Sequence, residues 1–425
     1  MRPTALAICM SVFTAIAPAG SFAQGPVSVE KWSTVYDAGL AANQTHNYEE
    51  SLRLFQQSWE TARTPGERGV SAIGLGQTYR RLDRLKDAKE WLERARQALS
   101  GDPRLSSRLA VTTADLADLY RTSGDYPDAE RLLREMLLSP SCDAESKALL
   151  RNSLADLLRE EGRSTEAQPL FAESAGLAAV SWKQRLSALV GLADIDGQNG
   201  DWEASVNRWN EALEMCRREH DAGAEAVVLR GLGTTWLKAG DRARAELLLR
   251  RSLWIMENNS DIPQEQVAGA HSGLAELYRS ENKLALAEDE LSRALRIDHT
   301  VLGDAHPQVA ILLEMLSDVY SARGEFGLAR EYATQASETM SSSFGENSMA
   351  VAAALTNRAA VEEWASDLGA AAKDYERAID IARAHPEHRS LESVMIRRYA
   401  GLLKVMHRPR EAKVLDAEAH SYRAK

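Results

Sequence analysis

The side chains that could carry out chemistry are few in this sequence and lie far apart. Nine histidines are scattered along the chain, and the closest pair is His385 and His388. Two imidazoles three positions apart can contact one metal ion on a helical turn. Pro386 places this pair in a loop or a first helical turn, and no third ligand lies close in the sequence. We therefore expect no metal site.

The sequence patterns of common catalytic and nucleotide sites are missing from the chain. They include H-E-x-x-H for zinc, G-x-S-x-G for a nucleophilic serine, and G-x-x-x-x-G-K-[ST] for phosphate binding. A G-x-G stretch occurs at Gly231 to Gly233, but it follows no predicted strand and so lacks the context of a dinucleotide site. We therefore predict that the protein is not an enzyme and binds no cofactor.

Acidic residues followed three positions later by arginine form a recurring charged pattern. The pairs are Asp118 with Arg121, Asp156 with Arg159, and Glu276 with Arg279. At this spacing the two side chains can pair on one helix face, which stabilises a helix by roughly 0.2–0.5 kcal/mol. Two interpretations remain open: a row of charges that contacts a bound peptide, or a solvated helix face with local ion pairs.

These charged pairs lie within a periodic framework of ten small residues, separated by steps of 37 to 42 residues. We call these residues the anchors, and each is expected to open the second helix of a helical hairpin. Such a period indicates stacked hairpins that bury their apolar faces against each other. The anchors are Ser51, Ala88, Ala129, Ala167, Ser205, Ala245, Ala287, Ala329, Ala371 and Ala412.

Glycine stands five positions before half of the anchors, at the turn between the two helices of a hairpin. A chain that leaves a helix here adopts a positive φ, which glycine reaches most easily. The glycines are Gly124, Gly162, Gly200, Gly240 and Gly324.

The residues around the anchors resemble the tetratricopeptide repeat. In the third unit Leu116, Ala117 and Tyr120 precede Ala129 and Leu133, as in the family pattern L-G-x-x-Y followed by A-x-x-x-F. Over about 266–384 the step lengthens, and residues 293–310 are similar to the kinesin light chain type of repeat. The resemblance implies an all-α protein: an α-solenoid, or right-handed superhelix, of about ten hairpins. His306 and Pro307 belong to this repeat signature, which favours a structural role for His306.

In tetratricopeptide superhelices the first helix of each hairpin lines the concave groove, and the resemblance implies the same here. The groove would bind protein or peptide segments. The candidate partner-binding residues are Gln77, Arg80, Arg81, Asp118, Arg121, Asp156, Arg159, Asp194, Lys238, Glu276, Arg279 and Asp318. We expect their arginines to form a solvent-facing row.

Two other roles stay open for the protein. One is a sensor or regulatory subunit whose groove closes on a signalling peptide, and the other is an envelope scaffold that self-associates or assembles other proteins.

The N-terminus differs from the repeats. Arg2 is the only charge before Glu30, and residues 5–17 form an apolar run too short to span a bilayer. Residues 21–23, Ser-Phe-Ala, supply small residues for cleavage before Gln24. The sequence predicts a signal peptide over 1–23, a short leader over 24–28 and a single solenoid over 29–425. We expect an exported protein, periplasmic or secreted, with no membrane span in the mature chain; an uncleaved anchor is the alternative.

Two cysteines, Cys142 and Cys216, remain after the predicted cleavage. An exported pair invites a disulfide, but two repeats separate these residues, beyond the roughly 7 Å Cα limit for a bridge. We expect unbridged thiols, or an intermolecular bond if Cys142 is exposed.

The net charge of −11 argues against binding to nucleic acid or to anionic membranes. It suits basic or neutral peptide partners, and it suits plain solubility equally well.

The last two repeats depart from the pattern. Glu362 stands where the first helix of repeat nine should carry its aromatic residue, and Asp416 replaces the buried aromatic of the second helix in repeat ten. A polar outer face is expected of a terminal repeat, since nothing stacks beyond it.

Overall fold

The structure, a computed structural model, describes residues 29–45, 47–82, 84–385 and 389–421. Within these residues the chain forms twenty α-helices and one short 3-10 helix, η1 (Pro103–Leu105), and no strand. The predicted all-α solenoid of helical hairpins is confirmed. The predicted signal peptide and leader lie outside the described residues, as does His388.

The helices follow each other as ten hairpins, and we call the first helix of each hairpin its A helix and the second its B helix. The A helices are α1 (Val29–Gln44), α3 (Pro65–Arg81), α5 (Ser106–Thr122), α7 (Ala144–Glu160), α9 (Trp182–Gln198), α11 (Ala222–Lys238), α13 (Gln264–Ser280), α15 (Pro307–Ala322), α17 (Met349–Trp364) and α19 (Arg389–Val405). The B helices are α2 (Tyr48–Thr61), α4 (Leu85–Leu99), α6 (Tyr126–Leu137), α8 (Ser164–Gly176), α10 (Trp202–Arg218), α12 (Arg242–Glu257), α14 (Leu284–Leu302), α16 (Phe326–Phe344), α18 (Leu368–Arg383) and α20 (Pro409–Ser421).

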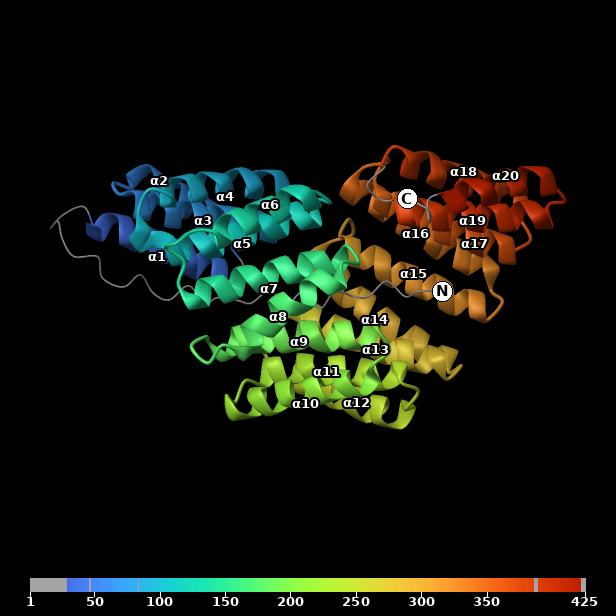
Figure 1. Ribbon diagram of the computed structural model, residues 1–425, viewed down its shortest axis with the longest axis horizontal. Coiled ribbons are helices and arrows are strands. Elements are labelled where there is room, and N and C mark those ends of the chain that lie inside the picture. Colours follow the sequence, from blue (N-terminus) through green and yellow to red (C-terminus); the bar gives the residue numbers. More distant parts are fainter. Residues whose placement is uncertain (1–28, 46, 83, 386–388, 422–425) are drawn as a thin grey trace. The chain divides into compact units, whose positions relative to one another are not determined.

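The chain divides into two compact units, Met1–Arg218 and Glu219–Lys425, which contain five hairpins each. Figure 1 colours α1 to α10 from blue to green and α11 to α20 from yellow-green to red. Within each unit every A helix packs on its own B helix, and from the second hairpin on also on the B helix of the hairpin before it. Each unit is therefore a continuous stack of hairpins.

The anchors lie where the two helices of a hairpin cross most closely. All ten anchor residues are fully buried. The facing position on the A helix, twelve residues earlier, is equally restricted: a Cβ added at Gly233 would lie 2.9 Å from Leu249 Cγ and 3.4 Å from the Ala245 carbonyl oxygen. Only small residues at both positions allow the two backbones to approach this closely, which explains the periodicity of the sequence.

Where the anchor is serine, its hydroxyl stabilises the same crossing. Ser51 Oγ donates to the Gly39 carbonyl at 3.1 Å, and Ser205 Oγ donates to the Ala193 carbonyl at 2.7 Å. In each case the acceptor lies on the A helix, at the position that faces the anchor. A buried hydroxyl costs free energy unless it is bonded, so serine replaces alanine here without leaving an unsatisfied group.

The turns between A and B helices share one left-handed residue. The five predicted glycines have φ between 77° and 93°, which confirms the prediction. The same position is occupied by non-glycine residues in three other repeats: Asn282 with φ 58°, Ser366 with φ 62° and His407 with φ 60°. The fold therefore imposes this backbone conformation whether or not the residue suits it.

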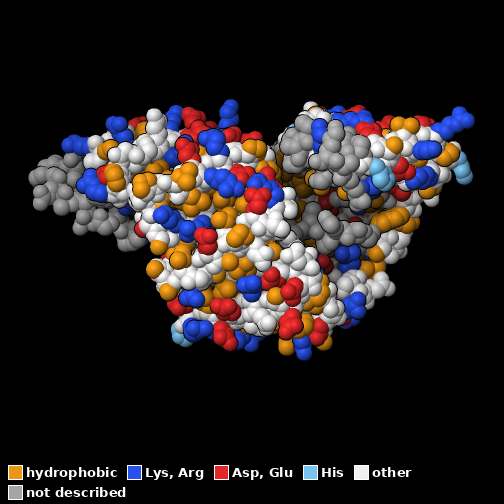
Figure 2. All heavy atoms as spheres, viewed as in Figure 1, with side chains coloured by type: hydrophobic (Ala, Val, Ile, Leu, Met, Phe, Trp, Pro, Cys, Tyr) orange, Lys and Arg blue, Asp and Glu red, His pale blue; other side chains and the backbone are white. Residues whose placement is uncertain are grey.

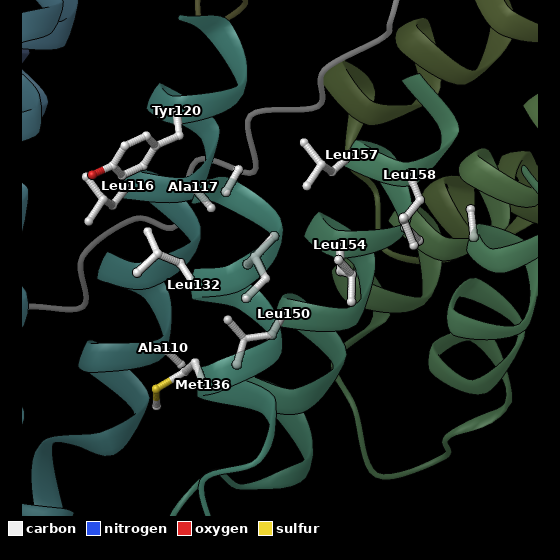
Figure 3. Packing of buried hydrophobic residues seen from close by; sticks show 14 of the residues in the cluster. Ala110, Leu116, Ala117, Tyr120, Leu132, Met136, Leu150, Leu154, Leu157 and Leu158 are labelled. Atoms are coloured by element: carbon white, nitrogen blue, oxygen red, sulfur yellow. The ribbon is translucent and has the colours of Figure 1, made fainter. Parts of the chain in front are cut away.

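The A helices form a layer of their own within each unit. The helix α7 contacts both α5 and α9, and in the second unit α11 contacts α13 while α15 contacts α17. Figure 3 shows how leucines of α7, including Leu150 and Leu154, pack toward α5 and α6. Because A helices approach the next A helix while B helices pack mainly on A helices, the A layer is the inner side of each stack.

The described residues contain no helix that is both long and apolar enough to cross a membrane.

The left-handed turn residues give a direct test of this turn geometry. Replacing Ser366 by glycine should raise the free energy of unfolding by roughly 0.5–1 kcal/mol, because glycine removes the steric cost of positive φ. Denaturant unfolding of the full chain measures the change. Ser292→Gly, in the middle of α14, is the matched control and should lower stability by a similar amount. Equal destabilisation by both substitutions would show that the turn at Ser366 is not left-handed.

Candidate partner-binding surface

The polar residues of the A layer in the first unit are linked from helix to helix. The Arg80 guanidinium on α3 lies 2.8 Å from an Asp118 carboxylate oxygen on α5. Arg121, also on α5, donates to both carboxylate oxygens of Glu160 on α7 at 2.8 Å. Gln77 Nε2 donates to Asp115 at 3.0 Å. These contacts join three consecutive A helices across their inner side, and we call them the A-layer ladder.

The ladder continues into α9 through Arg159. This arginine donates to Asp156 on its own helix at 3.0 Å, and its Nη1 lies 3.8 Å from an Asp194 carboxylate oxygen on α9. Arg121 likewise donates through Nε to Asp118 of its own helix at 3.1 Å. The acidic–Arg pairs at i,i+3 therefore form in repeats three and four, and each arginine also reaches a carboxylate of the next repeat.

The prediction that these arginines face solvent is wrong for Arg159, whose side chain is only 4% exposed. Arg121 is also mostly buried, at 14%. Burial alone would lower the pKa of Arg159, but the carboxylates of Asp156 and Asp194 act against it and raise that pKa. Arg159 is therefore a structural cation between repeats. The pattern of residue types shows where an arginine sits on a helix, but not that the next A helix covers it.

The same positions are more open in the second unit. Arg279 on α13 and Asp318 on α15 are exposed, Glu276 is half-buried, and Lys238 on α11 is exposed. Among the residues that the structure describes, no ion pair within 4 Å joins Arg279 to Asp318 or to Glu276. Asp318 is exposed as a whole residue, but the neighbouring A helices partly desolvate its carboxyl group and so raise its pKa, and the nearby positive charge of Arg279 opposes that shift. This part of the A layer keeps its charged groups available to a partner.

Two carboxylates of the A layer were missed by the sequence analysis. Asp115 accepts the bond from Gln77, and Glu314 on α15 accepts a 3.1 Å bond from Asn357 on α17. Burial raises the pKa of Glu314 to about 7, so it is partly protonated at neutral pH. Each lies one helical turn before a predicted residue, Asp118 or Asp318. Extending the predicted face by one turn toward the N-terminus of each A helix would have found both.

The remaining candidate groups are His306, the potential metal ligands and the two cysteines, and none of them forms a recognisable binding site within the described residues. His306 Nδ1 accepts from the Gln308 backbone N–H at 3.1 Å and caps α15, which confirms its structural role. No group of three potential metal ligands lies together within the described residues. Cys142 and Cys216 are both buried, and no disulfide joins them, as expected from their separation. The burial of Cys142 also removes the condition under which an intermolecular bond was expected.

Comparison with known proteins identifies the repeats. Three sequence models of the tetratricopeptide repeat match the chain, at residues 184–258 and 266–342, 109–139, and 71–95. The chain therefore contains tetratricopeptide repeats in both units. No curated protein sequence matches it.

One solved structure supports the same fold, and two others are similar over about half of this chain. A tetratricopeptide repeat protein from Parabacteroides merdae is 12% identical, with a TM-score of 0.50, over 68% of this chain and 99% of the other. BtubC from P. vanneervenii is 24% identical over 52% of this chain and 91% of its own, with a TM-score of 0.48. A Podosopora anserina protein described as a kinesin light chain with TPR-like repeats is 18% identical over 48% and 97%, with a TM-score of 0.41.

The ladder predicts energetic coupling between repeats. In a double-mutant cycle with Arg121→Gln and Glu160→Gln, we expect a coupling free energy of about 0.5–3 kcal/mol, because the pair is mostly shielded from water. The control pair is Arg131 with Asp128 on α6, whose side chains are 60% and 53% exposed. Its coupling should stay below about 0.5 kcal/mol. Denaturant unfolding gives both values, and equal coupling in the two cycles would contradict a structural ladder.

Proposed function

We propose that this chain of tetratricopeptide repeats is a non-catalytic interaction protein that binds an extended segment of a partner protein along its A layer. The observation that carries the proposal is the recurrence of charged and polar residues at the same positions of successive A helices. Tetratricopeptide repeats are typical of protein–protein interaction modules. A surface that repeats from helix to helix suits a ligand that also repeats, which is a peptide backbone.

The spacing of the repeats matches an extended peptide. Packed helices lie about 8–10 Å apart, and an extended chain rises about 3.3 Å per residue. Each A helix would therefore contact roughly three residues of the bound segment. In the second unit such a segment meets Lys238 on α11, Glu276 and Arg279 on α13, and Asp318 on α15. A partner with charges of both signs at about three-residue spacing fits this order.

The two units contribute differently to this proposal. In the first unit, the carboxylates of Asp118 and Asp194 and the guanidinium of Arg80 are engaged in the ladder. A partner that binds there would contact side chains that already form ion pairs within the fold. In the second unit Arg279 and Asp318 are exposed and can change partners without breaking an ion pair of the fold. The second unit therefore supplies the stronger charged contacts.

Export forms the second part of the proposal. The apolar run over 5–17 and the small residues over 21–23 have the pattern of a cleaved secretory signal. The partner would then be a periplasmic or extracellular protein, and a cross-linking pull-down from that compartment is the way to identify it.

The contribution of the A layer can be tested on Arg279. Once a partner has been identified, Arg279→Glu should weaken its binding at least tenfold, or by about 1.4 kcal/mol, because a charge that contacts the segment is reversed. Titration calorimetry measures the affinity, and thermal unfolding should be unchanged because Arg279 is exposed.

The control is Arg293→Glu on α14, a B-helix arginine of the same repeat whose side chain is 48% exposed. It applies the same change in net charge on the other layer and should leave the affinity within about twofold. Equal effects of the two variants would mean that binding responds to overall charge only. Full affinity in Arg279→Glu would exclude this part of the A layer as the site.

Export predicts a defined N-terminus. Mass spectrometry of the protein isolated from its native host should find a chain that begins at Gln24 or within a few residues of it. The matched variant Ala23→Arg disrupts the small-residue pattern required for cleavage and should accumulate uncleaved. Native protein that retains Met1 would refute the predicted cleavage.

A further inference from the structure

The B helix α12 carries two large apolar side chains that no other helix covers. Leu247 is 70% exposed and Trp254 is 64% exposed. They are seven positions apart, so they lie on the same face of the helix, about 10 Å apart along its axis. Tryptophan rarely remains this exposed, because covering it removes a large apolar area from water.

The same positions are polar in the neighbouring repeats of the second unit. Two positions after the anchor, where α12 has Leu247, repeats seven and eight have Asp289 and Glu331. Nine positions after the anchor, where α12 has Trp254, repeat eight has Glu338. The packing of the hairpins therefore does not require apolar residues here. Single exposed apolar residues occur at equivalent positions in repeat three, as Leu138, and in repeat ten, as Val414, whereas α12 has one at both positions.

Arginines flank the exposed apolar pair. The helix contains four arginines against two glutamates, in a chain whose net charge is −11. Arg244, Arg250 and Arg251 lie on the same side as Leu247 and Trp254, and their side chains are 61%, 59% and 55% exposed. Each guanidinium lies within 4 Å of one carboxylate of this chain. Because a guanidinium has five N–H donors, one carboxylate does not occupy all of them. Over the face of the molecule shown in Figure 2, basic and acidic side chains are interspersed.

We propose that the outer face of α12, formed by Leu247 and Trp254 with Arg244, Arg250 and Arg251, binds an acidic amphipathic helix of a partner protein. Apolar residues of the partner would cover Leu247 and Trp254, and its Asp and Glu side chains would pair with the arginines. Helices recognised in this way place anchors at i, i+3 or i+4 and i+7. The surface lies on the B layer and is therefore separate from the A-layer site.

A second copy of this chain fits the surface poorly. A twofold axis through the middle of the apolar pair would pass between Arg250 and Arg251, since these positions lie halfway between Leu247 and Trp254. Two copies would then face each other with arginine against arginine, and like charges brought together oppose association. An acidic partner converts the same arginines into attractive contacts.

A membrane surface fits less well than a protein. Helices that lie in a membrane interface bury a wide apolar face along their length. The exposed large apolar residues of α12 are Leu247 and Trp254 alone, and Glu246 and Glu257 belong to the same helix. The acidic balance of the whole chain would also repel an anionic bilayer.

Site-specific photo-cross-linking tests the proposal on the full chain. Benzoyl-phenylalanine is placed at position 254, where it keeps an aromatic side chain, and at position 338 as the matched control on α16. Cross-linking is done in the native host, and mass spectrometry identifies the attached segment. We expect position 254 to capture a segment with net negative charge and apolar residues at helical spacing, at least fivefold above position 338.

Two further substitutions assign the contacts. With the cross-linker at position 254, Arg251→Glu and Leu247→Ala should each lower the yield at least fivefold, whereas Arg293→Glu should leave it unchanged; thermal unfolding confirms that each variant is folded. The proposal is overturned if position 254 captures a second copy of this chain, a lipid, or a neutral or basic segment. A yield no higher than that of position 338 would overturn it as well. Co-sedimentation that depends on Trp254, with vesicles of seven parts phosphatidylcholine to three parts phosphatidylglycerol, would assign the face to membranes instead.

Discussion

The close crossing of the two helices in each hairpin is the constraint on which the rest of the structure depends. It requires a small residue on both helices, and the ten fully buried anchors meet that requirement in every repeat. Because the crossing fixes the angle within a hairpin, it also fixes which A-helix residues face the next A helix. The A-layer ladder is a consequence of this geometry, since Arg80 and Asp118 meet only when α3 and α5 keep one relative orientation.

A second set of contacts fixes each hairpin to the next. The tyrosine at the end of the A-helix motif donates a hydrogen bond from its hydroxyl to the B helix of the preceding repeat. Tyr120 donates to Glu93 at 2.8 Å, and Tyr320 donates to Glu288 at 2.5 Å. In repeat seven the roles are reversed, because Arg250 donates to the Tyr278 hydroxyl at 2.7 Å. The ring fills the apolar gap between repeats while the hydroxyl bonds at its border. Arg250 therefore contributes both to the stack and to the outer face of α12.

The sequence predicted those features that depend on local residue type. The helical hairpins, their anchors and the five left-handed glycines follow from size and backbone freedom, so the pattern alone identifies them. Asn282, Ser366 and His407 occupy the same left-handed position, but their residue types do not require it, and only the repeat spacing indicates it. The burial of Arg159 was not predicted, because it depends on how closely α9 approaches α7. Whether one solenoid extends over residues 29–425 remains a prediction, because the helices divide into two compact units.

The ladder and the open positions of the second unit suggest a division of roles among equivalent residues. Buried ion pairs contribute little net stability, but removing one partner is costly because the other charge remains buried. A chain of such pairs through α3, α5, α7 and α9 therefore resists any change in the angle between those repeats. In the second unit, Arg279 and Asp318 occupy the corresponding positions without such pairing. Glu362 is buried at the aromatic position of α17 with one carboxylate oxygen that lacks a hydrogen-bond partner within the described residues, and burial raises its pKa to about 7. Its neighbour Val361 packs in the apolar core instead, and α17 packs on α16 of the preceding repeat. The ladder therefore fixes the charged positions of the first unit, whereas the proposed binding in the second unit relies on Arg279 and Asp318, which form no such pair among the residues that the structure describes.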